Sequence, residues 1–99
     1  GIDKNILEKY GAVSKEIAGQ MANRVRKLFN SKIGVSTTGI AGPGGGTKEK
    51  PVGLVYVALS SNEKLVVKKY NFHSDRNKNK IKSSQAILKI IQDYCESYA

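Results

Sequence analysis

The segment from residue 39 to residue 47, Gly-Ile-Ala-Gly-Pro-Gly-Gly-Gly-Thr, is where this chain could bind a ligand through its backbone. Glycine loses more conformational entropy on folding than other residues and packs poorly, so a dense run of it needs a reason. Backbone N–H groups that are not shielded by side chains can form a concave nest for an anion. We therefore expect a ligand cradle, and a flexible connecting loop is the alternative interpretation. The glycines of this candidate cradle are Gly39, Gly42, Gly44, Gly45 and Gly46.

Two familiar nucleotide-binding motifs do not fit this loop. A Walker loop needs glycine, four residues and then Gly-Lys-Ser/Thr, but Gly44 is followed by Gly45 rather than lysine. A dinucleotide fingerprint, Gly-x-Gly-x-x-Gly, is matched by Gly42 and Gly44, but its third glycine position holds Thr47. The segment that follows also has the pattern of a strand rather than a helix. The spacing therefore excludes both types.

Hydroxyl and cationic side chains flank the loop. Thr37 and Thr38 end the preceding strand, and the alternation of a strand sends one of them to each face. A threonine hydroxyl can hydrogen-bond a carboxamide, a phosphate or a catalytic water, but no base is adjacent that would make it a nucleophile. A β-branched strand end without function is the alternative.

Arg76 lies at an expected helix N-terminus, beside Ser74 and Asp75. Arginine forks onto phosphate and carboxylate groups, and helix N-termini favour anions. A solvated arginine is the alternative. His73, the single histidine, lies at a strand end, and we favour a non-catalytic role for it.

The hydrophobic pattern predicts the order helix, helix, strand, strand, strand, helix. Asp3 and Ser14 are the expected N-caps of the first two helices, and Ser74 or Asp75 that of the last. The run 52–59 is almost continuously apolar, which is typical of a central strand buried on both faces. A more charged strand, 65–72, should pair antiparallel with it nearer an edge. Two long amphipathic helices can cover both faces of the sheet, so we expect an α/β fold.

Composition limits the classes of function. Ninety-nine residues make one domain or less, and no apolar run approaches the ~20 residues of a membrane helix. The net charge of +9 suits anionic partners, with a solvated lysine-rich surface as the alternative. Cys95 is the only cysteine, so it can form neither an internal disulfide nor a zinc site, and we expect it in the core. With no export signal at the start of the chain, we expect a cytoplasmic location.

Beyond these patterns, the segment 38–47, followed by Glu-Lys-Pro-Val-Gly at 49–53, resembles the signature of the CinA C-terminal domain family. Its members are known as competence/damage-inducible proteins and as nicotinamide mononucleotide deamidases. Tyr-Gly-Ala-Val-Ser at 10–14 and Asp-Arg at 75–76 match the family in the right order. The resemblance spans nearly the whole chain.

The resemblance implies a three-layer α/β/α sandwich, which would be present here as a small, incomplete mixed sheet covered by helices. It implies that residues 1–99 are the C-terminal part of a single CinA-like domain. It also implies hydrolysis of a small nucleotide, nicotinamide mononucleotide, to nicotinic acid mononucleotide and ammonia, with no metal or cofactor, in a homo-oligomer. Carried over by position, Thr38 matches a hydroxyl residue of the family's catalytic site. The glycines match its substrate-binding loop, and Arg76 matches a substrate-contacting arginine.

This sequence departs from the family pattern in one respect. The family's nucleophilic serine lies in a Glu-Ser-Cys-Thr-Gly-Gly segment that precedes the part represented here, and these 99 residues contain no such segment. We therefore expect this chain alone to be inactive. The alternatives are a nucleotide- or nucleic-acid-binding module without catalysis and an oligomerisation module. Nucleic acid is the less favoured ligand because exposed aromatic residues, on which single strands stack, are few.

Overall fold

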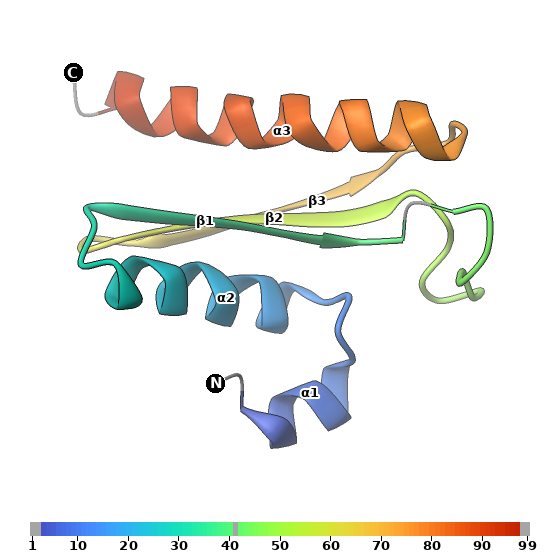
Figure 1. The fold of residues 1–99 in the computed structure, drawn as a ribbon, viewed down its shortest axis with the longest axis horizontal. Helices are drawn as coiled ribbons and strands as arrows, with labels where there is room; N and C mark the ends of the chain where they lie inside the picture. Colours follow the sequence, from blue (N-terminus) through green and yellow to red (C-terminus); the bar gives the residue numbers. More distant parts are fainter. Residues whose placement is uncertain (1–2, 41, 98–99) are drawn as a thin grey trace.

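The structure is a computed structural model that describes residues 3–40 and 42–97. Its helices and strands form three layers, with α2 on one face of the sheet and α3 on the other, while α1 packs beside α2 (Figure 1). This is the expected α/β/α sandwich. The elements are α1 (Lys4–Tyr10), α2 (Lys15–Leu28), β1 (Ile33–Gly39), β2 (Leu54–Ser61), β3 (Leu65–Asn71) and α3 (Arg76–Ser97).

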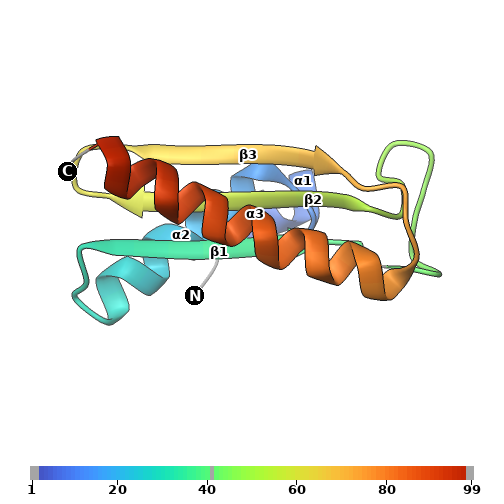
Figure 2. The same ribbon diagram turned by 90° about the horizontal axis from the view of Figure 1, so that it is seen from above.

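The sheet is a three-stranded antiparallel meander in the order β1-β2-β3. Thr38 lies opposite Tyr56, and Ala58 lies opposite Val67. The expected pairing of the second and third strands is confirmed, but the expectation of a mixed sheet is wrong for the described residues. Each strand returns directly beside the one before it, and no helix intervenes between strands to carry the chain back for parallel pairing. Seen from above the sheet, β1 and β3 form its two edges (Figure 2).

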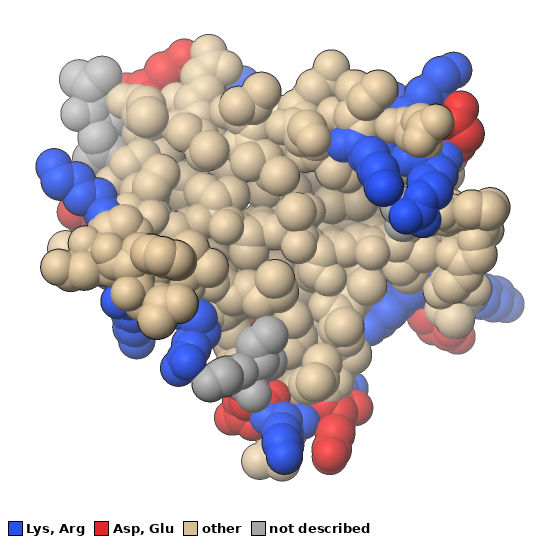
Figure 3. Space-filling model, in the orientation of Figure 1, with Lys and Arg blue, Asp and Glu red and all other residues tan. Residues whose placement is uncertain are grey.

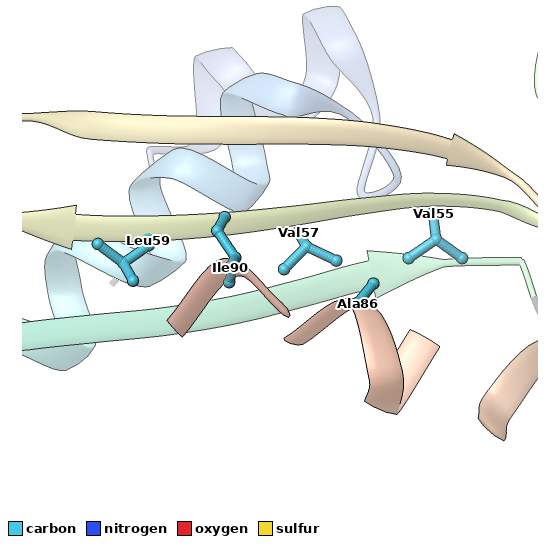
Figure 4. Close-up of a cluster of buried hydrophobic side chains, with 5 residues drawn as sticks. All are labelled: Val55, Val57, Leu59, Ala86 and Ile90. Atoms are coloured by element: carbon cyan, nitrogen blue, oxygen red, sulfur yellow. The ribbon is translucent and has the colours of Figure 1, made fainter. Parts of the chain in front are cut away.

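As predicted, the central strand β2 is buried on both faces. On the α3 face, Val55, Val57 and Leu59 pack with two α3 residues, Ala86 and Ile90 (Figure 4). On the other face, small side chains let α2 approach closely: Ala58 packs against Ala18 and Ala22. Because successive side chains of β2 point to opposite faces of the sheet, neighbouring residues of this strand pack against two different helices.

Polar side chains fix the helix starts where the sequence predicts them. Asp3 Oδ1 accepts a hydrogen bond from the Asn5 N–H, and Ser14 Oγ accepts one from the Ile17 N–H. At α3, Asp75 Oδ1 accepts a hydrogen bond from the Lys78 N–H at 2.9 Å. These bonds satisfy N–H groups that have no partner within the helix, so each cap sets where the following helix begins.

The central strand is longer than the apolar run 52–59 suggests, because β2 continues through two buried serines, Ser60 and Ser61. Ser60 Oγ accepts a hydrogen bond from Arg26 Nε at 3.0 Å and donates one to Asn23, so α2 holds this strand end in place.

Cys95 is exposed rather than part of the core. It lies seven residues after Leu88, and so on the same side of α3, and that side faces solvent: Leu88 is 68% exposed. Tyr98, near the C-terminal end of the chain, lies outside the described residues, as does Ala41 of the glycine loop. Among the described helices, none is both long and apolar enough to span a membrane.

Candidate functional site

The glycine loop connects β1 to β2 at the end of the sheet where α3 begins (Figure 1). Two backbone hydrogen bonds close its base. Ile40 N–H donates to the Leu54 carbonyl at 2.9 Å, and Gly53 N–H donates to the Ile40 carbonyl at 2.6 Å. Further out, Thr47 N–H donates to the Lys50 carbonyl at 2.8 Å. The loop is therefore anchored at its base and folded upon itself, not merely a loose connection.

The loop glycines fall into two groups. Gly39, Gly42 and Gly46 are needed by packing, because a Cβ at each would lie within 3 Å of Val55 or Val52 atoms. By contrast, a Cβ on Gly44 would meet no atom within 4 Å, and one on Gly45 would lie 3.8 Å from Ile40. Packing therefore explains the first group, and a φ of +90° explains the glycine at position 45. Gly44 is the position at the loop tip whose lack of a side chain is required neither by packing nor by the backbone conformation.

Arg76 ties the loop to α3. Its Nη1 donates to the Gly42 carbonyl at 2.7 Å, across 34 positions in the sequence. A shallow recess of about 420 Å³ surrounds this contact. Five N–H groups are available on a guanidinium, so the arginine can hold the loop and still donate to an anion. The recess is lined by Pro43, Val52, Ser74, Asp75, Arg76 and Asn77.

Thr38 points toward the other face of the sheet. Its Oγ1 donates to the Ala12 carbonyl, in the connection between α1 and α2, at 2.9 Å. Lys50, from the far end of the glycine loop, donates to the Tyr10 carbonyl in the same region. The Thr38 proton is thus used within the protein, and its oxygen keeps the capacity to accept a hydrogen bond.

Thr37 faces the α3 side of the sheet, as the alternation of β1 requires. It lines a groove of about 350 Å³ between β1 and the early turns of α3. The other lining residues are Gly39, Val55, Lys80, Ser83, Ser84 and Ile87. The fold thus brings Arg76 to the glycine loop and leaves Thr38 on the opposite face from Arg76.

The first turns of α3 carry cationic side chains, although the N-terminus of a helix favours negative charge. The first turn has no acidic residue, and Arg76, Lys78 and Lys80 follow each other at every second position. Lys and Arg side chains extend from this end of α3 toward the sheet (Figure 3). In the first turn, Arg76 and Lys78 are disfavoured by the helix dipole, each typically by about 0.3–1 kcal/mol at an exposed position, so a bound anion would relieve the repulsion.

The sequence analysis did not predict that Lys80, Ser83 and Ser84 line a groove beside the glycine loop. One signal for Lys80 was present in the sequence, because it follows Arg76 by four residues and so lies on the same helix face. His73 is exposed between β3 and α3. In the described part of the chain, no three His, Cys, Asp or Glu side chains gather as a metal site would need.

Comparison with known proteins places this chain in a family. The family model described as the CinA C-terminal domain matches residues 1–95. The chain belongs to the CinA C-terminal domain family. A relative from Thermoanaerobacter pseudethanolicus, named as competence-damage inducible, is 53% identical over 94 residues, covering 95% of this chain and 23% of the relative. One from Clostridium acetobutylicum with the same name is 59% identical over 76 residues, or 77% of this chain and 18% of the relative.

Solved structures of CinA-family proteins share the fold. The competence/damage inducible protein from Agrobacterium tumefaciens superimposes with a TM-score of 0.90 at 32% identity, covering 94% of this chain and 58% of that one. A protein from Klebsiella pneumoniae gives a TM-score of 0.91 at 22% identity, covering 99% and 61% respectively. The chain therefore spans about a quarter or less of these two relatives' length and about three-fifths of these two solved chains.

Proposed function

We propose that this chain supplies the substrate-holding part of a nicotinamide mononucleotide deamidase, as the C-terminal part of a CinA-like domain in a cytoplasmic, homo-oligomeric enzyme. The observation that carries the proposal is the hydrogen bond from Arg76 to the Gly42 carbonyl, which fixes the family's glycine loop against a cationic helix end. A guanidinium and a helix N-terminus favour negative charge in this recess, and the Asp75 carboxylate that also lines it is occupied by the Lys78 N–H, so we propose a small anionic nucleotide as the ligand.

The proposed reaction is hydrolysis of a carboxamide. A serine oxygen attacks the carboxamide carbon, the C–N bond breaks, and ammonia leaves with the serine proton. Water then cleaves the ester and leaves a carboxylate on the pyridine ring. The serine comes from a segment outside these 99 residues, and backbone N–H groups stabilise the oxyanion.

In this scheme Thr38 accepts a hydrogen bond from the reacting groups, since its own proton is donated to the Ala12 carbonyl. Arg76 and the glycine tip hold the anionic part of the nucleotide. Thr38 and Arg76 lie on opposite faces of the sheet, so the two residues serve different parts of the reaction. Replacing Thr38 with valine removes the oxygen at nearly constant shape and isolates its contribution.

Ammonia release from nicotinamide mononucleotide tests the proposal. The 99-residue chain alone should release none, because its sequence lacks the Glu-Ser-Cys-Thr-Gly-Gly segment. A chimera in which the 94 aligned residues of this chain replace the matching segment of the Thermoanaerobacter relative should be active. Turnover by the isolated chain would contradict the missing-nucleophile argument, and an inactive but folded chimera, beside an active parent, would contradict the proposed function.

Calorimetry distinguishes a nucleotide-binding site from a nucleic-acid-binding surface. The chain should bind nicotinamide mononucleotide more tightly than single-stranded DNA at physiological salt, because it offers a compact anion cradle and few exposed aromatic rings. Tighter binding of DNA that weakens steeply with salt would favour the nucleic-acid-binding alternative instead.

The two sheet edges support the homo-oligomeric part of the proposal. The edge strand β3 carries Lys68 and Lys69, which discourage pairing with another strand. Strand β1 has no charged side chain, and in the described part of the chain it pairs only with β2. Its open edge is therefore where a second copy could add a strand. Light scattering that finds a strict monomer up to high concentration would contradict this.

A further inference from the structure

A small cavity lies between β3 and the C-terminal part of α3, at the opposite end of the sheet from the glycine loop. Among the described residues, no Cα of α3 comes within 8 Å of a Cα of β3, because α3 packs over β1 and β2. Figure 2 shows that α3 crosses the sheet diagonally and that its C-terminal end reaches the β3 side. The space that this crossing leaves over β3 is a cavity of about 160 Å³.

The floor of this cavity is apolar. Leu59 and Val66 lie directly opposite each other in the pairing of β2 with β3, and Ile90 of α3 packs above them. Leu59 and Ile90 are both buried. Because an aliphatic cavity of about 150 Å³ admits a group the size of benzene, this floor suits the hydrocarbon side chain of a small ligand.

The sheet side of the cavity is cationic. Lys64 and Lys68 both line it. They lie on the same face of β3 as Val66, because alternate residues of a strand share a face. Lys68 Nζ has no hydrogen-bond or ion-pair partner within residues 3–40 and 42–97. This wall therefore offers N–H donors and positive charge.

The helix side of the cavity offers acceptors instead. Ile90, Asp93 and Ser97 share one face of α3, because they are spaced by three and four residues. Asp93 Oδ1 accepts a hydrogen bond from Lys89 at 3.0 Å, and a carboxylate keeps further lone pairs. Ser97 Oγ donates to the Asp93 carbonyl at 2.9 Å, which leaves its oxygen as an acceptor. The last turn of α3 has no basic residue, and the C-terminal end of a helix favours positive charge.

We propose that this cavity binds a free α-amino acid with an apolar side chain, such as leucine. The ligand carboxylate accepts from Lys68, its ammonium group donates to Asp93 and Ser97, and its side chain lies on Leu59 and Val66. A ligand with only a carboxylate leaves the acceptor wall unused, and a ligand with only an ammonium group leaves the lysines unused. A zwitterion satisfies both walls. The site is separate from the proposed amide hydrolysis, which concerns the other end of the sheet.

Titration of the isotope-labelled 99-residue chain, followed by nuclear magnetic resonance, tests the proposal. L-leucine at neutral pH and constant ionic strength should give saturable shifts of the Val66, Lys68 and Asp93 amide resonances. Two analogues each lack one charged group: 4-methylpentanoate lacks the ammonium group and 3-methylbutylamine lacks the carboxylate. Each should bind about tenfold more weakly, the loss typical of a charge-assisted hydrogen bond in a partly exposed site. Glycine keeps both charges but loses the hydrocarbon side chain, so it should also bind at least about tenfold more weakly.

Variants assign each wall to one end of the ligand. Lys68→Met should weaken leucine binding about tenfold and leave the affinity for 3-methylbutylamine unchanged. Its matched control is Lys69→Met, which removes the same charge one residue along β3, on the opposite face, beside Tyr56. This control should change leucine affinity less than twofold.

Asp93→Asn should weaken leucine and 3-methylbutylamine but not 4-methylpentanoate. Because this variant also breaks the pair with Lys89, its control is Lys89→Met, which breaks the same pair, keeps the carboxylate and should not weaken leucine.

Three results would overturn the proposal. The first is the absence of saturable shifts up to the solubility limit of leucine. The second is binding of 4-methylpentanoate or glycine as tight as that of leucine, which would mean that the zwitterion or the apolar floor is not recognised. The third is equal weakening by Lys68→Met and Lys69→Met, which would mean that net charge alone attracts the ligand. None of these results depends on the chimera's deamidase activity, so the two proposals fail separately.

Discussion

The structure predicts that alanine substitutions at two glycines of the same loop will have very different effects on the free energy of unfolding. Gly42 is buried, adopts a φ of +90°, and a Cβ there would lie 2.5 Å from Val52 Cγ1. Gly44 is exposed, has no positive φ, and a Cβ there would meet nothing within 4 Å. Gly42→Ala and Gly44→Ala are therefore matched in chemistry and sequence neighbourhood, and they differ only in the space and backbone conformation available to the added methyl group.

The expected size follows from two contributions. Placing a Cβ on a residue with positive φ costs about 1–2 kcal/mol. Crowding a buried side chain adds about 1–3 kcal/mol, and the lower end applies here because only one neighbour is severely approached. Gly42→Ala should then lower the free energy of unfolding by about 2–3 kcal/mol. Gly44→Ala should leave it unchanged or slightly raised, since alanine restricts the unfolded chain.

Urea denaturation followed by circular dichroism measures both effects on the same chain. A loss of about 2–3 kcal/mol corresponds to a drop in melting temperature of roughly 10–20 °C for a domain of this size. Equal stabilities for the two variants would refute the division of the glycines into packing and tip positions. A second readout concerns function: Gly44→Ala should weaken nicotinamide mononucleotide binding while stability is kept, because a methyl group at the tip would hold the ligand away from the loop N–H groups.

Three further predictions concern stability, chemical access and pH. Ser14→Ala removes the N-cap of α2 and should destabilise the chain by about 1 kcal/mol in the same denaturation experiment, whereas Ser14→Asp should lose less because a carboxylate also caps. Cys95 should react with iodoacetamide in native buffer about as fast as after unfolding; strong protection would contradict its exposure. The hydrogen bond from Lys89 to Asp93 raises the pKa of the lysine above its ordinary value of 10.5. The stabilisation from this pair is therefore fully present below pH 10.5 and lost as pH rises through the raised pKa. Since the pair is exposed, Lys89→Ala should flatten only a shallow decline in stability at alkaline pH.

Much of the fold could be predicted because it depends on local patterns. The caps at Asp3 and Ser14 follow from single residues and their neighbours, and the two-sided burial of β2 follows from its continuous apolar run. The expected burial of Cys95 failed because it depends on the rotation of a helix about its axis. A small difference in that rotation turns Leu88 and Cys95 to solvent, although the spacing of apolar residues along α3 is helical throughout.

The candidate site was only partly predictable for a related reason. Strand alternation predicts that Thr37 and Thr38 point to opposite faces, but it does not tell which face meets which helix. The contact between Arg76 and Gly42 joins residues 34 positions apart, and the pairing of Thr37 with Lys80 in one groove depends on how α3 crosses the sheet. Such contacts arise from tertiary packing, which no local pattern encodes.

In the described part of the chain, one edge of β1 is unpaired and runs up to the glycine loop, so a strand that added there would lie next to the proposed substrate site. A strand that pairs with β1 lies about 4.8 Å away, so its residues stand beside Thr37, Thr38 and Gly39 whatever their sequence. Any segment or subunit that adds there brings its side chains into the neighbourhood of the glycine loop. Under the proposed function, the geometry of the substrate site would then depend on which strand pairs with β1.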